Sequence, residues 1–151
     1  MNKEQFVYVT YIRTTPAKLW EALTEPQFIR QYWFNTTVEC SWKKGSPWKM
    51  VRPDGSLTDS GEILEIDPPR RMVIRWQNEW KTELKAEGAS RCTIELEPVD
   101  NAVKLTITHE IDRPESKLIT GVSGGWPRIL SNLKSLLETG EVILRTTVTA
   151  G

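Results

Sequence analysis

The sequence predicts one α+β domain in which a curved antiparallel sheet of about six to seven strands wraps a long C-terminal helix. Between residues 36 and 111, short segments alternate apolar and polar side chains and are separated by turn residues. Such alternation is typical of antiparallel strands with one covered and one solvated face. A strongly amphipathic helix follows them, and the apolar face of a sheet needs such an element to cover it. At 151 residues the chain has the length of one domain, expected to span residues 1–140 with a tail at 141–151.

The chain opens with a strand and two short helices. Residues 5–13 are mostly β-branched or aromatic, which favours a strand. Thr15 stands where a helix N-cap is expected, because a proline follows it at the first helical position. Apolar residues at helical spacing extend that helix over residues 16–24. Pro26 opens the second helix, whose apolar face ends at Trp33.

The middle of the chain reads as strands joined by turns. Glycine and proline mark the breaks at 44–47, 53–55 and 67–69, because glycine permits a positive φ and proline presets a bend. The polar segment 79–87 alternates glutamate with lysine and is interpreted as a solvated hairpin. Residues 99–102 are expected to join the last two strands as a hairpin. The clearest expected strands are residues 48–52, 61–66, 72–77, 92–97 and 103–109.

The last element is expected to be a helix from Gly125 to Thr139. Six apolar residues between Trp126 and Leu137 recur at helical spacing, and this stripe is wide enough to lie across a sheet. Pro127 then falls in the first turn and Gly140 at the C-terminal cap. The preceding run, residues 121–125, contains three glycines and is interpreted as a flexible loop and a candidate lid over a pocket mouth. The tail has no evident partner within the chain.

Composition excludes several function classes. Twenty basic residues balance twenty acidic ones, whereas a nucleic-acid-binding protein needs a basic surface. One histidine, His109, and two isolated cysteines, Cys40 and Cys92, do not form a metal-binding pattern. The polar N-terminus lacks a signal-peptide core, and no apolar run reaches the length of a membrane span. We therefore expect a cytoplasmic protein with no cofactor, no metal and no nucleic-acid partner.

Several motifs occur in an order that resembles a known superfamily. The segment YIRTTPAKLWEALT at residues 11–24 resembles the opening signature of the START-like (SRPBCC, helix-grip, Bet v-like) superfamily. The branch it resembles most groups polyketide cyclases with activators of heat-shock-protein ATPase, and the similarity covers about residues 5–140. The other matches are Tyr32-Trp33, GEILEIDPP at 61–69, Arg75-Trp76, His109-Glu110, Gly125-Trp126-Pro127 and LKSLLE at 133–138.

The resemblance implies a helix-grip fold with a cavity between the sheet and the C-terminal helix. Members of the superfamily bind lipids, sterols, hormones or polyketides there. Aromatic rings suit such a cavity, because they offer large rigid contact area at small entropic cost. His109 shares the inward face of its strand with apolar residues and would be the polar contact for a ligand. The proposed site consists of Tyr8, Trp33, Trp48, Met50, Trp76, Ile107, His109, Trp126, Leu130 and Leu133.

Each of these features also has a purely structural interpretation. The same rings could fill the cavity instead of lining it. His109 could be a core histidine bonded to a backbone carbonyl or to a carboxylate such as Glu110. Used as a general base, it would need a second group to orient it, and the sequence does not identify one.

Three functions remain open on the sequence. The leading hypothesis is binding of a small apolar or aromatic molecule between sheet and helix, without established catalysis. The first alternative is a protein-interaction module of co-chaperone type, acting through the outer face of the sheet or through the tail. The second alternative is a cyclase-like or hydrolase-like enzyme that uses His109. The protein is expected to be a monomer or a homodimer.

Overall fold

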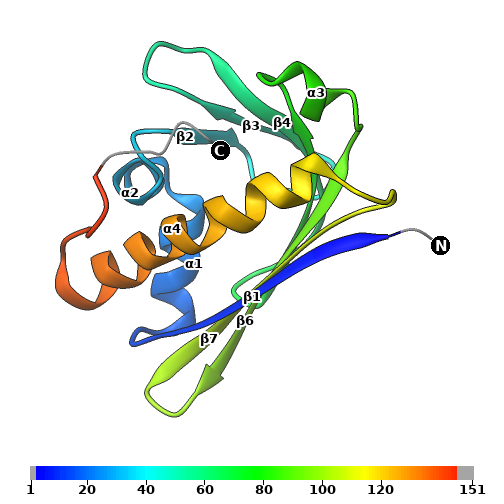
Figure 1. The fold of residues 1–151 in the computed structure, drawn as a ribbon. Helices are drawn as coiled ribbons and strands as arrows, with labels where there is room; N and C mark the ends of the chain where they lie inside the picture. Colours follow the sequence, from blue (N-terminus) through cyan, green and yellow to red (C-terminus); the bar gives the residue numbers. More distant parts are fainter. Residues whose placement is uncertain (1–2, 146–151) are drawn as a thin grey trace.

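The computed structural model describes residues 3–145 and has the helix-grip architecture (Figure 1). A long helix crosses the concave face of a curved sheet, and two short helices lie beside its C-terminal half. The elements in chain order are β1 (Glu4–Ile12), α1 (Pro16–Thr24), α2 (Pro26–Tyr32), β2 (Thr37–Cys40), β3 (Pro47–Val51), β4 (Leu57–Asp67), β5 (Arg71–Asn78), α3 (Thr82–Lys85), β6 (Ser90–Val99), β7 (Ala102–Ile111) and α4 (Lys117–Thr139).

The sheet is antiparallel and has seven strands in the order β1-β7-β6-β5-β4-β3-β2. Consecutive strands from β2 to β7 are neighbours, and β1 joins at the far edge beside β7. The 99–102 hairpin is confirmed, since Val99 pairs with Ala102 at the end of the β6–β7 ladder. The predicted fold class is therefore correct, because alternation and turn residues are local signals that specify antiparallel pairing.

The first helix begins as the sequence predicts. Thr15 is its N-cap, and the Thr15 Oγ1 accepts a hydrogen bond of 3.2 Å from the backbone N–H of Lys18. The segment interpreted as a solvated hairpin is different: it contains the one-turn helix α3, whose Leu84 is buried. The alternating charges indicated correctly that one side of this segment is exposed, but they did not indicate that Leu84 is buried.

The predicted start of the last helix is wrong. α4 begins at Lys117, so the glycine-rich run at 121–125 is helical and is not a loop or a lid. Ser116 caps the helix through its side chain, which accepts from the N–H of Ile119 at 3.1 Å. The Glu87 carboxylate covers the same end by accepting from the N–H of Lys117 at 2.7 Å. Pro127 lies inside the helix and not in its first turn.

The apolar stripe of α4 packs onto the concave face of the sheet. Trp126, Leu130 and Leu133 are buried in one core cluster with side chains of the sheet, among them Trp48 and Met50 of β3. Between the sheet and the middle of α4, the described residues leave no enclosed cavity. Side chains fill the space that the sequence assigned to a ligand.

Part of the tail is attached to the domain. The buried Asn132 of α4 accepts hydrogen bonds from the N–H groups of Ile143 and Leu144 at 3.1 and 2.7 Å. Its amide donates to the Leu144 carbonyl at 2.8 Å. Residues 141–145 therefore have an intramolecular partner that the sequence did not reveal, and the rest of the predicted tail, 146–151, lies outside the described residues.

Over residues 3–145, every helix is too short or too polar to cross a lipid bilayer.

Candidate functional site: a cleft beside the N-terminal half of α4

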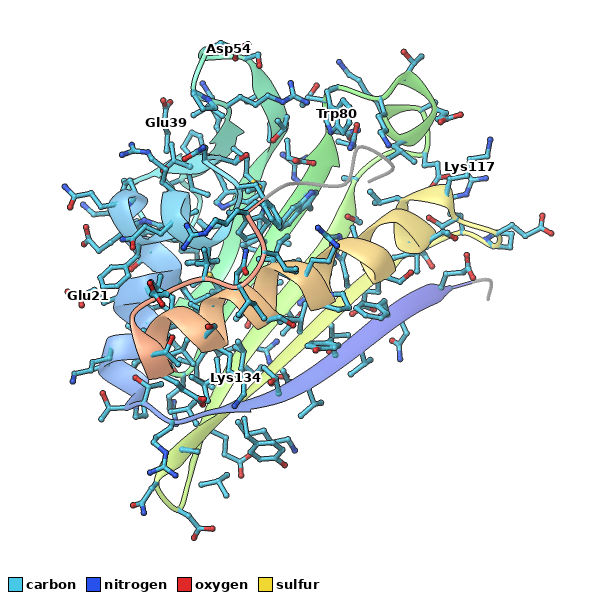
Figure 2. The ribbon with its side chains drawn as sticks, turned by 60° about the vertical axis from the view of Figure 1, so that its left-hand side comes forward. Glu21, Glu39, Asp54, Trp80, Lys117 and Lys134 are labelled. Carbon is cyan, nitrogen blue, oxygen red and sulfur yellow. The ribbon has the colours of Figure 1, made fainter. Side chains whose placement is uncertain are left out.

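A cleft of about 750 Å³ lies between the first turns of α4, the β3–β4 hairpin and α3. Its size falls in the range of small-molecule sites. Figure 2 labels Trp80 and Lys117 on this side of the molecule. We call this space the outer lobe. Its lining residues are Trp33, Phe34, Thr36, Arg52, Pro53, Thr58, Asp59, Trp80, Lys81, Glu83, Leu84, Lys117, Thr120, Gly121, Gly124, Gly125, Arg128 and Ile129.

A smaller space of about 170 Å³, which we call the inner lobe, adjoins the outer lobe and reaches the aromatic core. Six residues line both lobes, so the two form one continuous cleft: Trp33, Asp59, Leu84, Gly121, Gly125 and Ile129. The inner lobe is also lined by Trp76, Asn78, Leu118, Val122 and Trp126. Its walls are mainly apolar and its polar groups are few, as is usual in ligand pockets.

Three glycines of α4 form the helix wall of the cleft. A Cβ added at Gly121, Gly124 or Gly125 would meet no heavy atom within 4 Å. No close approach of another chain segment therefore requires glycine here. Each glycine in a helix interior costs about 1 kcal/mol relative to alanine. The three glycines therefore lower the stability of the helix along the face that lines the cleft.

Three tryptophans close the inner end of the cleft. The Trp33 and Trp126 rings meet edge to face with centroids 5.3 Å apart, and the Trp76 ring lies 5.8 Å from Trp126. Trp48 packs behind Trp76 at 4.5 Å. Such contacts add to the stabilisation from burial alone. The rings are held rigidly, so the apolar floor of the cleft is preorganised.

His109 is buried behind this floor with both ring nitrogens bonded. The Trp126 indole N–H donates to His109 Nδ1 at 3.2 Å, which fixes Nδ1 as an acceptor. The proton of the neutral ring is therefore on Nε2 and is donated to Ser90 Oγ at 2.8 Å. The Ser90 hydroxyl in turn donates to the Trp76 carbonyl at 3.2 Å. Burial lowers the pKa of His109 to about 3, so the ring is neutral at pH 7.

Asp59 is the carboxylate at the junction of the two lobes. Its Oδ1 accepts a 2.9 Å hydrogen bond from the indole N–H of Trp76. Burial raises the pKa of Asp59 to about 6, although the hydrogen bonds from Trp76 and Thr58 act in the opposite direction. The side chain thus presents an acceptor to the cleft and holds the Trp76 ring in place.

Basic side chains gather at the mouth of the outer lobe. The Arg52 guanidinium and the Lys81 ammonium each lie 4.8 Å from the centre of the Trp80 ring. Cation–π attraction therefore holds both side chains beside this half-exposed ring. Lys117, also on the rim, pairs with Glu83 at 3.6 Å.

The structure separates the proposed site residues into three cleft residues, one residue of β1 and six core residues. Trp33, Trp76 and Trp126 line the cleft. Tyr8 is half-buried on β1 and stacks on Phe6. The remaining six are buried in the core and do not line either lobe: Trp48, Met50, Ile107, His109, Leu130 and Leu133. Ligand contact by any member of the set remains a prediction.

The sequence did not identify Arg52, Asp59 and Lys81 as cleft residues. They lie in the β3–β4 turn, in β4 and at the start of α3, and they carry no shared periodicity. The signal for Asp59 in the sequence is an acidic side chain near the start of a strand that follows a turn. Nothing in the pattern, however, places it next to Trp76.

A family model described as "Activator of Hsp90 ATPase homolog 1-like protein" matches residues 13–138. Among curated proteins, none matches the chain.

Solved structures similar to this chain share its fold. The Aha1 dimer from Colwellia psychrerythraea has 20% sequence identity and a TM-score of 0.74, and the match covers 91% of this chain and 98% of that one. An HSP90 activator from Plasmodium falciparum has 23% identity and a TM-score of 0.72, with 88% and 95% covered. A protein from Cytophaga hutchinsonii has 29% identity and a TM-score of 0.72, with 93% and 97% covered.

Proposed function

The chain belongs to the family of activator of Hsp90 ATPase homolog 1-like proteins, and on this scaffold we propose that it binds a small apolar or aromatic molecule in the cleft beside the N-terminal half of α4. The observation that carries the proposal is the open cleft itself, walled by three helix glycines and floored by preorganised tryptophan rings. The site differs from the space under the middle of α4, which side chains fill.

The cleft supports binding better than catalysis. The inner lobe offers mainly apolar surface with two polar side chains, Asp59 and Asn78, whereas both nitrogens of His109 are already bonded within the core. A general base must reach the proton that it abstracts, and His109 lines neither lobe. The enzymatic alternative therefore gains no support from the position of His109.

Titration with a neutral aromatic probe, 2-naphthylmethanol, tests the proposal through the fluorescence of the cleft tryptophans. Gly121→Leu should weaken binding at least about tenfold, because the added side chain enters both lobes. Gly121→Ala is the matched control: it adds one methyl group and should largely keep binding. Both variants should fold, since a Cβ at this position meets nothing within 4 Å. Equal affinity of wild type and Gly121→Leu, or no binding by either, would refute the proposal.

A second candidate is a protein-interaction module, favoured by a strip on the convex side of the edge strand β1. Val7, Val9 and Tyr11 are 48%, 43% and 50% exposed on that face. Two similar structures are described as an Aha1 dimer and as an HSP90 activator. The test measures the ATPase rate of an Hsp90 and the sedimentation of the protein, with wild type and with Val9→Lys. If neither measurement responds to Val9→Lys, the strip is not an interface.

A further inference from the structure

We infer that the ligand of this cleft is an amphipathic organic anion, whose apolar body enters the inner lobe and whose single carboxylate meets Arg52 and Lys81 at the mouth. The inference rests on the proposed function, because it concerns the ligand of the same cleft. It adds the charge of the ligand and its orientation.

The charge of the rim favours an anion. Among the described residues, four basic and two acidic side chains line the outer lobe: Arg52, Lys81, Lys117 and Arg128 against Asp59 and Glu83. Lys117 and Glu83 pair with each other, and Arg128 lies over the Phe34 ring. Arg52 and Lys81 against Asp59 still leave an excess of one positive charge. Within residues 3–145, neither Arg52 nor Lys81 lies within ion-pair distance of a carboxylate. Both charges thus remain available to an incoming anion.

Trp80 positions the two cations at the mouth. Arg52 and Lys81 approach its ring to the same distance of 4.8 Å, from the β3–β4 turn and from the start of α3. Arg52 Nη1 also donates to Ser56 Oγ at 3.2 Å. A guanidinium and an ammonium held on one ring require little ordering when a carboxylate binds, and charge-assisted hydrogen bonds to such a group are strong.

Asp59 sets the orientation of the ligand in the cleft. Its carboxylate lies where the inner and outer lobes meet, so an anionic group that moved inward would meet a like charge. The inner lobe beyond it is lined mainly by tryptophan, leucine, valine and isoleucine side chains, and the uncharged Asn78 is its other polar side chain. The apolar end of the ligand therefore points inward, and its carboxylate stays at the rim.

Three probes with one ring system test the inference: 2-naphthoate, 2-naphthylmethanol and 2-naphthylmethylamine, titrated at pH 7.5 and low salt. The carboxylate should bind about tenfold more tightly than the alcohol, and added salt should reduce that advantage. In Arg52→Gln/Lys81→Gln the carboxylate should lose the advantage while the alcohol keeps its affinity. Lys49→Gln, an exposed lysine on β3 that does not line the cleft, is the matched control and should change nothing. An octanoate and octanol pair repeats the comparison with an aliphatic body.

The outcomes separate this inference from the proposed function. Equal binding of carboxylate and alcohol by the wild type would overturn the inference and leave the binding function intact. Tightest binding of the amine would overturn it as well, because Asp59 would then dominate recognition. If the carboxylate still bound more tightly than the alcohol in Arg52→Gln/Lys81→Gln, Arg52 and Lys81 would not be the side chains that contact it. Absence of binding by every probe would overturn both proposals.

Discussion

At the scale of single residues, hydrogen bonds between distant side chains organise the floor of the cleft. His109 bonds to Trp126 and Ser90, and Asp59 bonds to Trp76. The sequence identified the histidine and the tryptophans as inward-facing but not as one network. Polar groups in such a network must all be satisfied, because an unpaired buried group costs about 1–3 kcal/mol.

His109→Phe should lower the free energy of unfolding by about 1–3 kcal/mol at pH 7, because the buried indole N–H of Trp126 loses its acceptor. Urea denaturation measures the loss. Thr106→Val, on the solvated face of β7, is the control and should change stability by less than about 0.5 kcal/mol.

The same residue makes stability depend on pH. The folded pKa of about 3 lies below the ordinary histidine value of 6.5, so below about pH 6.5 the unfolded state binds the proton first. Wild-type stability should therefore fall from pH 6.5 toward pH 3 by a component that His109→Phe lacks. An imidazole signal in the folded protein that titrates near 6.5 would contradict the burial argument.

Asp59 should titrate near pH 6 in the folded protein, which carboxyl-carbon NMR can follow. Its folded pKa of about 6 exceeds the ordinary aspartate value of 3.8, so the native state binds the proton more strongly. Stability should then fall as pH rises from about 3.8 to 6. Asp59→Asn should remove this component and keep the Trp76 hydrogen bond, since the amide oxygen still accepts. If the two proteins showed the same pH dependence, Asp59 would not be shielded from solvent.

At the scale of elements, α4 shows how tertiary contacts override local propensity. Its first turns contain three glycines, and Pro127 interrupts its interior. Local preference alone favours a loop followed by a helix that starts near the proline. The helix nevertheless starts ten residues before Pro127, at Lys117, because Ser116 and Glu87 satisfy its first N–H groups and because Leu118 and Ile119 are buried. The apolar stripe was predictable, whereas the start was not.

Glu87→Ala should destabilise the protein by about 1 kcal/mol through loss of this cap. Partial burial raises the pKa of Glu87, but hydrogen bonds from Ser116, Lys117 and Leu118 outweigh it and lower the pKa overall. The stabilisation is therefore complete above the ordinary glutamate pKa of 4.5 and is lost as pH falls through the lower folded pKa. Thermal unfolding at pH 7 and pH 3 measures both effects.

Glu83→Ala is the matched control for this substitution. Its side chain is exposed and pairs with Lys117 on the surface, where an ion pair contributes little. Equal losses from the two substitutions would mean that the Glu87 carboxylate does not cap α4.

At the scale of the whole molecule, the sheet, α2, α4 and the start of the tail form one connected unit. Asn132 of α4 is the link: it bonds to the Tyr32 carbonyl at 3.4 Å and to the backbone of Ile143 and Leu144.

Asn132→Ala should therefore speed amide hydrogen exchange at residues 143 and 144. It should also lower stability by about 1–3 kcal/mol, because the buried partners lose their hydrogen bonds.

Ser131→Ala is the neighbouring control: among the described residues, the side-chain hydrogen bonds to Ile143 and Leu144 come from Asn132, so the loss of the Ser131 hydroxyl should leave exchange at 143 and 144 unchanged. Protected amides at both positions in Asn132→Ala would show that another contact holds this segment.

The sequence by itself determined the class of the fold, an antiparallel sheet of about six to seven strands, the helix stripe from Trp126 to Leu137 and the position of His109 on the inward face of its strand. These features follow from periodicity, turn residues and caps, which act between residues close in the chain. Only the tertiary structure decided where α4 begins, which polar groups satisfy His109, that the space beneath the middle of α4 is filled, and that a cleft opens beside its glycines. Those features depend on contacts between segments separated by 17 to more than 30 residues. A local pattern reports that a side chain is buried, but it does not report what lies against it.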